Sequence, residues 1–152
     1  MAAEATRHQL KVAVLERDEL GGTCPNRGCI PTKALCRHAE VLNLLRQAPE
    51  FGISATNVEF QYAEAFKRKQ SVVEQLRQGI ASLLASGQVT VIKGEAKISG
   101  KNAVTVGSDT FTATSIVIAT GSAPKALPIE GADLCMSSDD ALAMETLPAS
   151  LC

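Results

Sequence analysis

The chain has 152 residues, of which 45% are hydrophobic and 20% are charged, and its formal net charge is −1. This composition is typical of a globular domain with a real core, and the balanced charge gives no electrostatic reason to expect a nucleic acid or an anionic membrane surface as partner. No apolar run approaches the roughly 18–20 residues that span a bilayer, and the N-terminus lacks the apolar stretch of a secretory signal. We therefore expect a cytoplasmic protein.

The first third of the chain is expected to hold two helices with a strand between them. Residues 1–9 are typical of the end of a helix, and Leu10–Glu16 is a short, mostly apolar run that predicts a buried parallel strand. The glycine pair at 21–22 then breaks the chain before the second helix. Pro31 suits the first turn of that helix, where its missing N–H costs nothing, and a proline and a glycine shortly after residue 47 should end it.

A long amphipathic helix is expected over residues 60–86, because apolar residues recur there at helical spacing. The helix contains a basic triplet at residues 67–69. This triplet could be a binding patch, but we expect it to be part of a solvated helix face.

The period of the apolar residues changes to two after Gly87, and this alternation predicts a small antiparallel meander. Ser115–Ala119 is again a continuous apolar strand, and a short helix is expected near residues 139–144. Together the elements predict an α/β fold, in which a parallel sheet with helices carries an inserted antiparallel β-meander. The alternating pairs of the meander are Val89/Val91, Ala96/Ile98, Val104/Val106 and Phe111/Ala113.

The five cysteines are odd in number and uneven in spacing, which argues against a disulfide framework. Cys24 and Cys29 are five residues apart, and on an ideal helix their Cα atoms would lie about 8.6 Å apart. Because disulfides usually need less than about 7 Å, a bridge here requires a distorted turn, which Gly28 and Pro31 make possible. Such a bridge would be strained and reducible, so the pair is predicted to be redox-active rather than structural.

The groups around the cysteine pair also suit thiolate chemistry. A helix N-terminus, Arg27 and Lys33 would each stabilise negative charge on sulfur and lower a thiol pKa. Two alternatives stay open: a pair of unrelated buried thiols, or a zinc site, for which only Cys36, His38 and distant cysteines could supply further ligands. We expect no metal site, and no partner can be read for the remaining residues of these types, Cys135, Cys152 and His8.

The segment from residue 21 to residue 33 reads GGTCPNRGCIPTK. It resembles the signature of the class I pyridine nucleotide–disulfide oxidoreductases, and its second half is most similar to the dihydrolipoamide dehydrogenase branch of that family. Glutathione reductases and mercuric reductases carry close variants. The other expected elements occur in the family's order along essentially the whole chain, which implies a partial Rossmann-like domain that binds FAD.

The resemblance implies a role for most residues of the signature. Cys24 would exchange with the disulfide substrate, and Cys29 would lie against the flavin ring. Lys33 would lie near the reactive nitrogen of the flavin, and Gly22 and Thr23 would contact the cofactor. The one local departure is the proline after the first cysteine, where the family has an apolar residue, and a proline is compatible with an early helix position.

Three regions outside the signature are implied to bind FAD. Glu16 would accept hydrogen bonds from the ribose hydroxyls of the adenosine half. Ala96 would meet the adenine through main-chain groups, and the turn formed by Thr120, Gly121 and Ser122 would lie near the flavin and pyrophosphate. From the residues alone, an exposed acid, a simple meander turn and a plain loop are the alternatives.

The resemblance also implies which part of the family's architecture this sequence represents. Residues 1–146 correspond to the FAD-binding domain without its first strand and glycine-rich loop, and residues 147–152 correspond to the start of the linker into an NAD-binding domain. An unpaired strand edge and the missing phosphate loop would weaken both folding and cofactor binding. We therefore expect the chain alone to bind FAD weakly or not at all, and to be inactive.

The reaction implied for the parent enzyme is the oxidation of dihydrolipoamide by NAD⁺ through Cys24, Cys29 and FAD. The implied partners are lipoyl groups of 2-oxoacid dehydrogenase complexes or of the glycine cleavage system, and a second copy of the chain in a homodimer. The alternatives within the family are a glutathione reductase, a mercuric reductase or a transhydrogenase. An alternative of another class is a non-catalytic remnant or a fragment that works in trans.

Overall fold

The computed structural model describes residues 2–125 and 127–151, so the expectations that involve Met1 and Cys152 lie outside the described residues. The contacts divide the chain into two units. Unit 1 comprises residues 1–22 and 77–126 and holds all the β-strands found in the described part of the chain. Unit 2 comprises residues 23–76 and 127–152, and its regular elements are helices.

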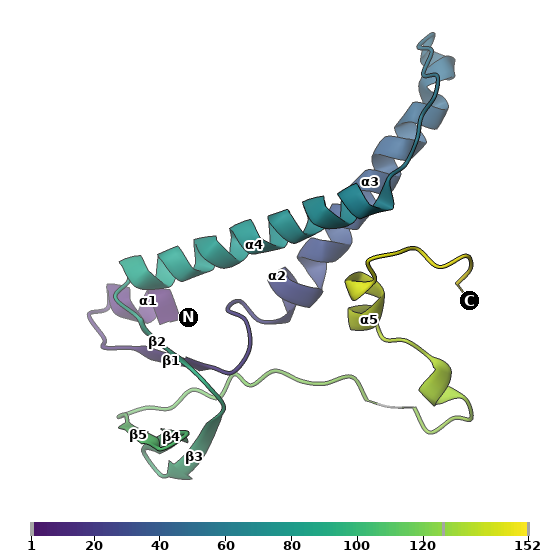
Figure 1. The fold of residues 1–152 in the computed structure, drawn as a ribbon. Coiled ribbons are helices and arrows are strands. Elements are labelled where there is room, and N and C mark those ends of the chain that lie inside the picture. The colour runs from purple at the N-terminus through teal and green to yellow at the C-terminus, as the bar shows by residue number, and fades with distance from the viewer. Residues whose placement is uncertain (1, 126, 152) are drawn as a thin grey trace. The chain divides into compact units, whose positions relative to one another are not determined.

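The parallel sheet of unit 1 consists of β1 (Ala13–Glu16) and β2 (Thr90–Lys93), which lie side by side in Figure 1. Glu16 is opposite Lys93, so the two strands end at the same edge. Helix α1 (Ala2–Arg7) precedes β1. The predicted helix and the predicted parallel strand that follows it are therefore confirmed, although β1 is only half-buried.

The partner of β2 corrects the prediction for the region around Val89 and Val91. Their alternation predicts the first strand of the antiparallel meander, but the strand formed here pairs with β1 in a parallel sheet. The assignment to the meander is therefore wrong. Alternation identifies a strand that is buried on one face, and it carries no information about which strand lies beside it.

The antiparallel sheet of unit 1 has three strands in chain order, β3 (Ala96–Gly100), β4 (Ala103–Val106) and β5 (Asp109–Thr112). Val104 of the central strand is buried. Gly107 opens the turn between β4 and β5 with a φ of 58°, which suits a tight hairpin connection. The predicted meander is thus confirmed for these three strands.

Residues 115–119 do not form the expected strand. Val117 and Ile118 are 65% and 69% exposed. An apolar segment becomes a strand only where a neighbouring strand completes its backbone hydrogen bonds, and within the described residues no strand lies along this segment. The prediction is wrong because apolar composition alone does not supply a pairing partner.

Unit 2 begins with α2 (Thr23–Arg27) and α3 (Cys29–Gln47), and α3 continues into the short 3-10 helix η1 (Ala48–Phe51). Gly52 ends η1 with a left-handed φ of 72°. Pro31 lies in the first turn of α3, as predicted, and its side chain is fully buried. The helix and its end are therefore confirmed.

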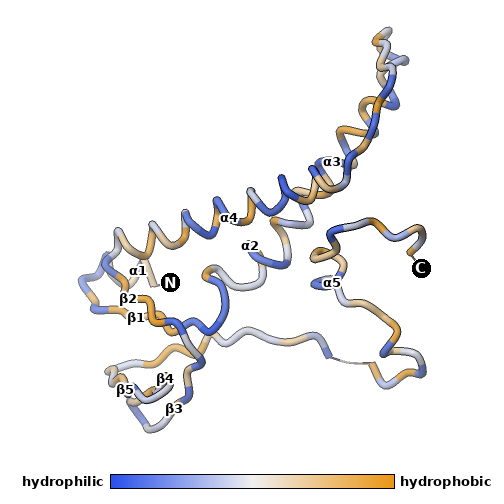
Figure 2. Tube along the Cα trace, viewed as in Figure 1, coloured by the Kyte–Doolittle hydropathy of each residue, from blue (hydrophilic) through white to orange (hydrophobic). Residues whose placement is uncertain are grey.

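The long helix α4 (Tyr62–Ser86) confirms the amphipathic helix expected in this region, and its trace in Figure 2 alternates between hydrophilic and hydrophobic residues. Val73 and Leu84 are buried, whereas Leu76 and Leu83 are 40% and 56% exposed. The residues of α4 up to Leu76 belong to unit 2, and the remainder belongs to unit 1. Each unit therefore buries part of the apolar stripe of this helix.

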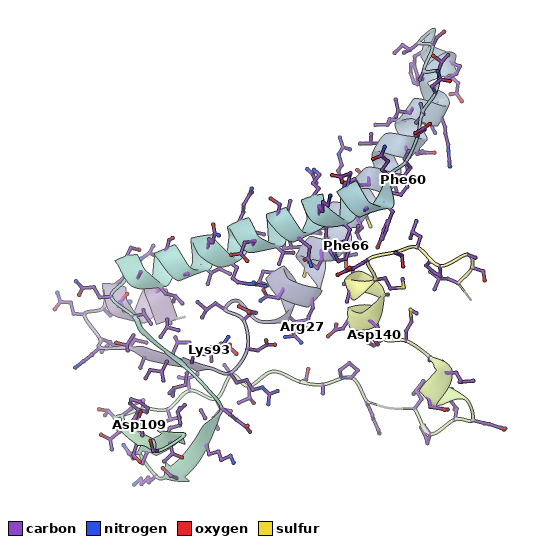
Figure 3. All side chains as sticks on the ribbon, in the orientation of Figure 1. Arg27, Phe60, Phe66, Lys93, Asp109 and Asp140 are labelled. Atoms are coloured by element: carbon purple, nitrogen blue, oxygen red, sulfur yellow. The ribbon has the colours of Figure 1, made fainter. Side chains whose placement is uncertain are left out.

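The last elements of unit 2 are the 3-10 helix η2 (Ala132–Leu134) and α5 (Ser138–Ala143), which confirms the short helix predicted there. Ser137 and Asp140 form a reciprocal cap at the start of α5. The hydroxyl of Ser137 donates to Oδ2 of Asp140 at 2.6 Å and its N–H donates to the same oxygen at 2.8 Å. These two hydrogen bonds, the hydroxyl first, lower the pKa of Asp140, which is labelled in Figure 3.

One residue of the basic triplet does not lie on a solvated face. The first two are exposed, as expected, but Lys69 is only 2% exposed. Its Nζ donates to the carbonyl of Leu142 at 2.5 Å and lies 3.7 Å from the ring centroid of Phe66, which is labelled in Figure 3. Desolvation lowers the pKa of Lys69, and the charge of Glu145 opposes that shift. The expectation is wrong for Lys69, because charges along a helix do not show where a distant segment will cover it.

Candidate functional site

Gly28 breaks the chain between the two cysteines of the candidate site. With a φ of −137° and a ψ of −114° it separates α2 from α3, and no side chain caps the start of α3. A Cβ at position 28 would lie 3.0 Å from the carbonyl oxygen of Thr23 and 3.3 Å from the Cα of Cys24. Glycine therefore allows a closer backbone approach than any other residue. The distorted turn predicted from the cysteine spacing is present.

The reactive side chains of α3 lie on its exposed face. Pro31 and Ala34 are buried and fix which side of the helix is covered. Cys29, Lys33 and Cys36 recur at helical spacing and are all exposed. A ligand can therefore reach both the second cysteine of the pair and the nearby cation.

Cys24 and Cys29 are free, exposed thiols whose side chains form a hydrogen bond. That hydrogen bond is the main cause that raises the pKa of Cys24 above its ordinary value of 9.0, and desolvation and the charge of Cys29 add to the shift. The main-chain hydrogen bond from Cys29 and the charge of Lys33 act in the opposite direction. Lys33 therefore lowers the pKa of Cys24, as predicted, but the net shift is upward because the contact with the Cys29 thiol outweighs an exposed cation that water screens.

The structure does not support either alternative reading of the cysteine pair. Among residues 2–125 and 127–151, no three His, Cys, Asp or Glu side chains gather closely enough to hold a metal ion. His38, the histidine nearest along the chain, instead donates from Nδ1 to the carbonyl of Ala34 at 2.7 Å. The two thiols are exposed and in contact, so they are not unrelated buried cysteines.

Glu16 lies at the C-terminal edge of the parallel sheet, as predicted. Its Oε1 accepts a hydrogen bond from the N–H of Asp18 at 2.8 Å, and its carbonyl accepts one from the N–H of Gly94 at 2.9 Å. Lys93, opposite Glu16 in the register and labelled in Figure 3, donates to the carbonyl of Asp18. Sequence reasoning missed Lys93, although a lysine that ends a β-branched strand was the available signal. Hydrogen bonds from Asp18 to Glu16 and from Lys93 to Asp18 therefore hold the loop after Glu16.

Ala96 begins β3 close to the same edge. The chain reaches it through Gly94, whose φ is 148° and whose added Cβ would lie 2.4 Å from Cγ1 of Val106. Ala96 is exposed and opposite Val106 in the antiparallel register. The main chain before Ala96 is thus held against β4 by a position that requires glycine.

The remaining predicted cofactor residues lie in exposed segments. Thr120, Gly121 and Ser122 follow the apolar run that forms no strand, and Gly121 has a left-handed φ of 72°. Gly22 is likewise left-handed, with a φ of 70°, and Thr23 begins α2. The structure brings Cys24, Cys29 and Lys33 together within unit 2. The cofactor roles of the glycine-containing turns stay predictions.

The residues of each unit fit part of an FAD molecule. In unit 1, a carboxylate accepts up to about four hydrogen bonds, so Glu16 can accept from ribose hydroxyls in addition to Asp18. In unit 2, Lys33 supplies an exposed cation beside the thiols, which suits an electron-accepting ring. For the pyrophosphate, however, the sequence contains no Gly-x-Gly-x-x-Gly loop leading into a helix. Glu16 and Lys33 are thus each chemically suited to a part of FAD, and their cofactor roles stay predictions.

Comparison with known proteins identifies the family to which this chain belongs. The chain matches the pyridine nucleotide-disulphide oxidoreductase family over residues 1–151. It belongs to that family. The dihydrolipoyl dehydrogenase of Chlamydia pneumoniae is 38% identical to this family member, and those of Bacillus subtilis and Chlorobaculum tepidum are 37% and 40% identical.

Each of these alignments covers 99% of the chain but only 33%, 35% and 34% of the respective relative. This pyridine nucleotide-disulphide oxidoreductase chain therefore spans about a third of the length of the curated relatives it matches. Its parallel sheet with helices and its separate antiparallel sheet agree with an α/β FAD-binding fragment. In the part of the chain that the structure describes, no helix combines the length and the apolar character needed to cross a membrane.

Proposed function

We propose that this chain is the part of a flavin-dependent dihydrolipoyl dehydrogenase that carries the redox-active cysteines, Cys24 and Cys29. The observation that carries the proposal is a pair of exposed, free thiols on either side of the break at Gly28, which packs closely against Cys24. Membership of the family and the names of the relatives support the same reaction class. The whole enzyme would oxidise dihydrolipoamide to lipoamide and pass the electrons to NAD⁺.

The exchange chemistry follows from the contact between the two sulfur atoms. With the pair oxidised, a thiolate of dihydrolipoamide attacks Sγ of Cys24, which forms a substrate–Cys24 disulfide, breaks the Cys24–Cys29 bond and leaves Cys29 as a thiolate. The second substrate thiol loses its proton to solvent and attacks the substrate sulfur that is bonded to Cys24. This closes the ring of lipoamide and releases Cys24 as a thiolate. Lipoamide leaves oxidised by two electrons, and the site is left with two reduced sulfurs. FAD, when bound, supplies the acceptor for these two electrons.

The two sulfurs are suited to different parts of this sequence. The raised pKa of Cys24 favours its protonation once it is displaced, because the thiol form is stabilised by the contact with Cys29. Cys29 lies in the first turn of α3, where the helix dipole favours negative charge. Lys33 on the same exposed face adds a positive charge. In this proposal Cys24 is the exchanging thiol, and Cys29 is the sulfur that leaves in the first step.

We assign the substrate and the partners from the names of the relatives and from the family resemblance. Lipoyl groups of 2-oxoacid dehydrogenase complexes or of the glycine cleavage system would deliver the dithiol, and the whole enzyme would be a homodimer. Glu16, Ala96 and the turn 120–122 would contact the FAD. A cytoplasmic location stays a prediction from composition.

Serine substitutions test the proposed site in the whole protein that contains this chain. Because neither single cysteine can form the disulfide, Cys24→Ser and Cys29→Ser should each lower dihydrolipoamide–NAD⁺ activity by about a thousandfold or more. Cys36→Ser is the matched control, since Cys36 is also exposed on α3, and it should stay within about twofold of wild type.

The measurement is the rate of NADH formation with dihydrolipoamide, compared with the rates on glutathione disulfide and on mercuric ion with a reduced nicotinamide. Activity that survives Cys24→Ser would contradict the proposal. A preference for glutathione disulfide or mercuric ion would show that the proposed substrate is wrong. It would leave the proposed redox role of the cysteine pair standing.

A further inference from the structure

We propose that Thr32 is a positioning residue for the redox pair: its hydroxyl locks the carbonyl of Gly28 and so holds Cys29 against Cys24. The inference rests on the proposed function of the cysteines. It extends that function to a side chain that touches neither sulfur and acts through the backbone between them.

Two hydrogen bonds reach the carbonyl of Gly28, and both come from Thr32. The N–H of Thr32 donates at 3.2 Å, and its Oγ1 donates at 2.7 Å. The first is the ordinary hydrogen bond that opens a helix, whereas the second is as short as hydroxyl hydrogen bonds usually are. Threonine hydroxyls often bond to the carbonyl four residues earlier. Here that carbonyl belongs to the residue at which the chain breaks.

The carbonyl of Gly28 controls the position of Cys29. Glycine has the greatest backbone freedom of any residue, and no side chain caps α3 at Gly28. The carbonyl of Gly28 and the nitrogen of Cys29 belong to one planar peptide group, so rotation about the ψ of Gly28 moves them together. Holding the carbonyl therefore holds Cys29.

The same glycine also lies against the other cysteine. A Cβ added to Gly28 would lie 3.3 Å from the Cα of Cys24. Gly28 therefore packs against Cys24 and is covalently bonded to Cys29. This packing keeps the backbone of Cys24 close to the residue that leads into Cys29. Thr32 is itself exposed, so its hydroxyl does not serve to fill a core.

The test measures the equilibrium between the dithiol and the Cys24–Cys29 disulfide in the chain as it stands. Reduced and oxidised glutathione set the redox state, and mass spectrometry of alkylated peptides reads it. Thr32→Val keeps the branched shape and removes the hydroxyl, and it should lower the equilibrium constant for forming the disulfide about two- to tenfold, as the loss of one hydrogen bond predicts. Thr32→Ser restores the hydroxyl and should return to the wild-type constant.

A second readout and a matched control separate positioning from general stability. In Thr32→Val, the pH at which half of Cys24 is alkylated should move down, because loss of contact with Cys29 removes the main cause of its raised pKa. Thr6→Val in α1 removes a similar hydroxyl bond, from Oγ1 to the carbonyl of Ala3 at 2.9 Å, and should leave both readouts unchanged. Circular dichroism of each variant should match wild type.

Three results are decisive. Equal equilibrium constants for wild type and Thr32→Val would overturn the role of Thr32 and leave the redox pair standing. A Thr32→Ser value as low as that of Thr32→Val would also overturn it, because the hydroxyl is the proposed cause. A wild-type chain that forms no Cys24–Cys29 disulfide at any glutathione ratio would contradict the proposed function itself.

Discussion

At Gly28 the backbone packs directly against the backbone of Thr23 and Cys24, because glycine has no side chain to separate them. An added methyl group would lie 3.0 Å from the carbonyl oxygen of Thr23, a contact that requires the neighbouring backbone to move by a few tenths of an ångström. The atoms that must move carry Cys24. The residue between the cysteines thus determines how closely the sulfurs approach, although it has no chemistry of its own.

Gly28→Ala should therefore destabilise the fold by about 1–3 kcal/mol, as overpacking does, and weaken the Cys24–Cys29 disulfide at the same time. Gly79→Ala is the matched control, because Gly79 lies within α4 and its added methyl group would meet nothing within 4 Å. That change should stabilise the helix by about 0.5–1 kcal/mol. Urea unfolding measures both free energies, and a neutral Gly28→Ala would show that the backbone contact is not restrictive.

The sequence was sufficient to find the cysteine pair but not to give its electrostatics. The spacing of Cys24 and Cys29 and the glycine between them predicted a distorted, redox-active turn, because those features are local. The direction of the pKa shift of Cys24 depends on which neighbour is in contact, and the sequence shows Arg27 and Lys33 but not the geometry of the thiols. Thr32 was missed for the same reason, since a threonine in the first turn of a helix is unremarkable without its partner.

At the scale of elements, α4 and the end of α5 are joined through side chains that reach backbone carbonyls. Lys69 donates to Leu142, and the hydroxyl of Tyr62 donates to the carbonyl of Met144 at 2.9 Å. Both acceptors lie at the C-terminal end of α5, where a helix leaves its last carbonyls without internal partners. Two α4 side chains therefore complete the hydrogen bonding of a helix too short to be stable alone.

Lys69→Met should cost about 1–3 kcal/mol, because the carbonyl of the half-buried Leu142 loses its donor. Lys67→Met is the matched control: Lys67 is exposed and pairs with Glu64 at 2.7 Å, so its loss should change stability by less than about 0.5 kcal/mol. The measurement is the free energy of unfolding in urea at neutral pH. Equal effects of the two changes would contradict the inferred role of Lys69.

The lowered pKa of Lys69 also predicts the direction in which the stability of the fold changes with pH. The pKa of Lys69 is lowered from its ordinary value of 10.5, so the folded chain binds this proton less tightly than the unfolded chain does. The contribution of Lys69 to stability should therefore rise as the pH increases from the folded pKa toward 10.5. Lys69→Met should remove that rise, and the Lys67→Met control should keep it.

Elements whose identity depends on local pattern were predictable, and those that depend on a distant partner were not. Helices α3 and α4 follow from apolar spacing and from the proline and glycine that end α3. β2 was recognisable as a strand, but its pairing with β1 was not. Residues 115–119 look like a strand and form none among the described residues, because a strand needs a hydrogen-bonding neighbour that composition cannot reveal.

At the scale of the whole molecule, the chain has residues suited to some parts of FAD and lacks the usual motif for another part. Glu16 in unit 1 and Lys33 in unit 2 each carry a side chain suited to part of FAD, but the given sequence holds no Gly-x-Gly-x-x-Gly loop of the kind that binds a pyrophosphate. The chain alone should therefore retain well under one FAD per molecule after gel filtration. The visible absorbance of flavin measures this, and the same chain in urea controls for flavin carried along non-specifically. A stoichiometric yellow protein would contradict the prediction.

The short distance along the chain between Cys24 and Cys29 has a thermodynamic consequence. A disulfide between them closes a ring of only six residues, and the chain-entropy relation gives about 2 kcal/mol for so small a ring. Opening and closing it changes the entropy of the unfolded chain about half as much as a loop of about 100 residues would. Oxidation of the pair should therefore change the stability of the domain by about 2 kcal/mol, which is less than a long covalent loop would give.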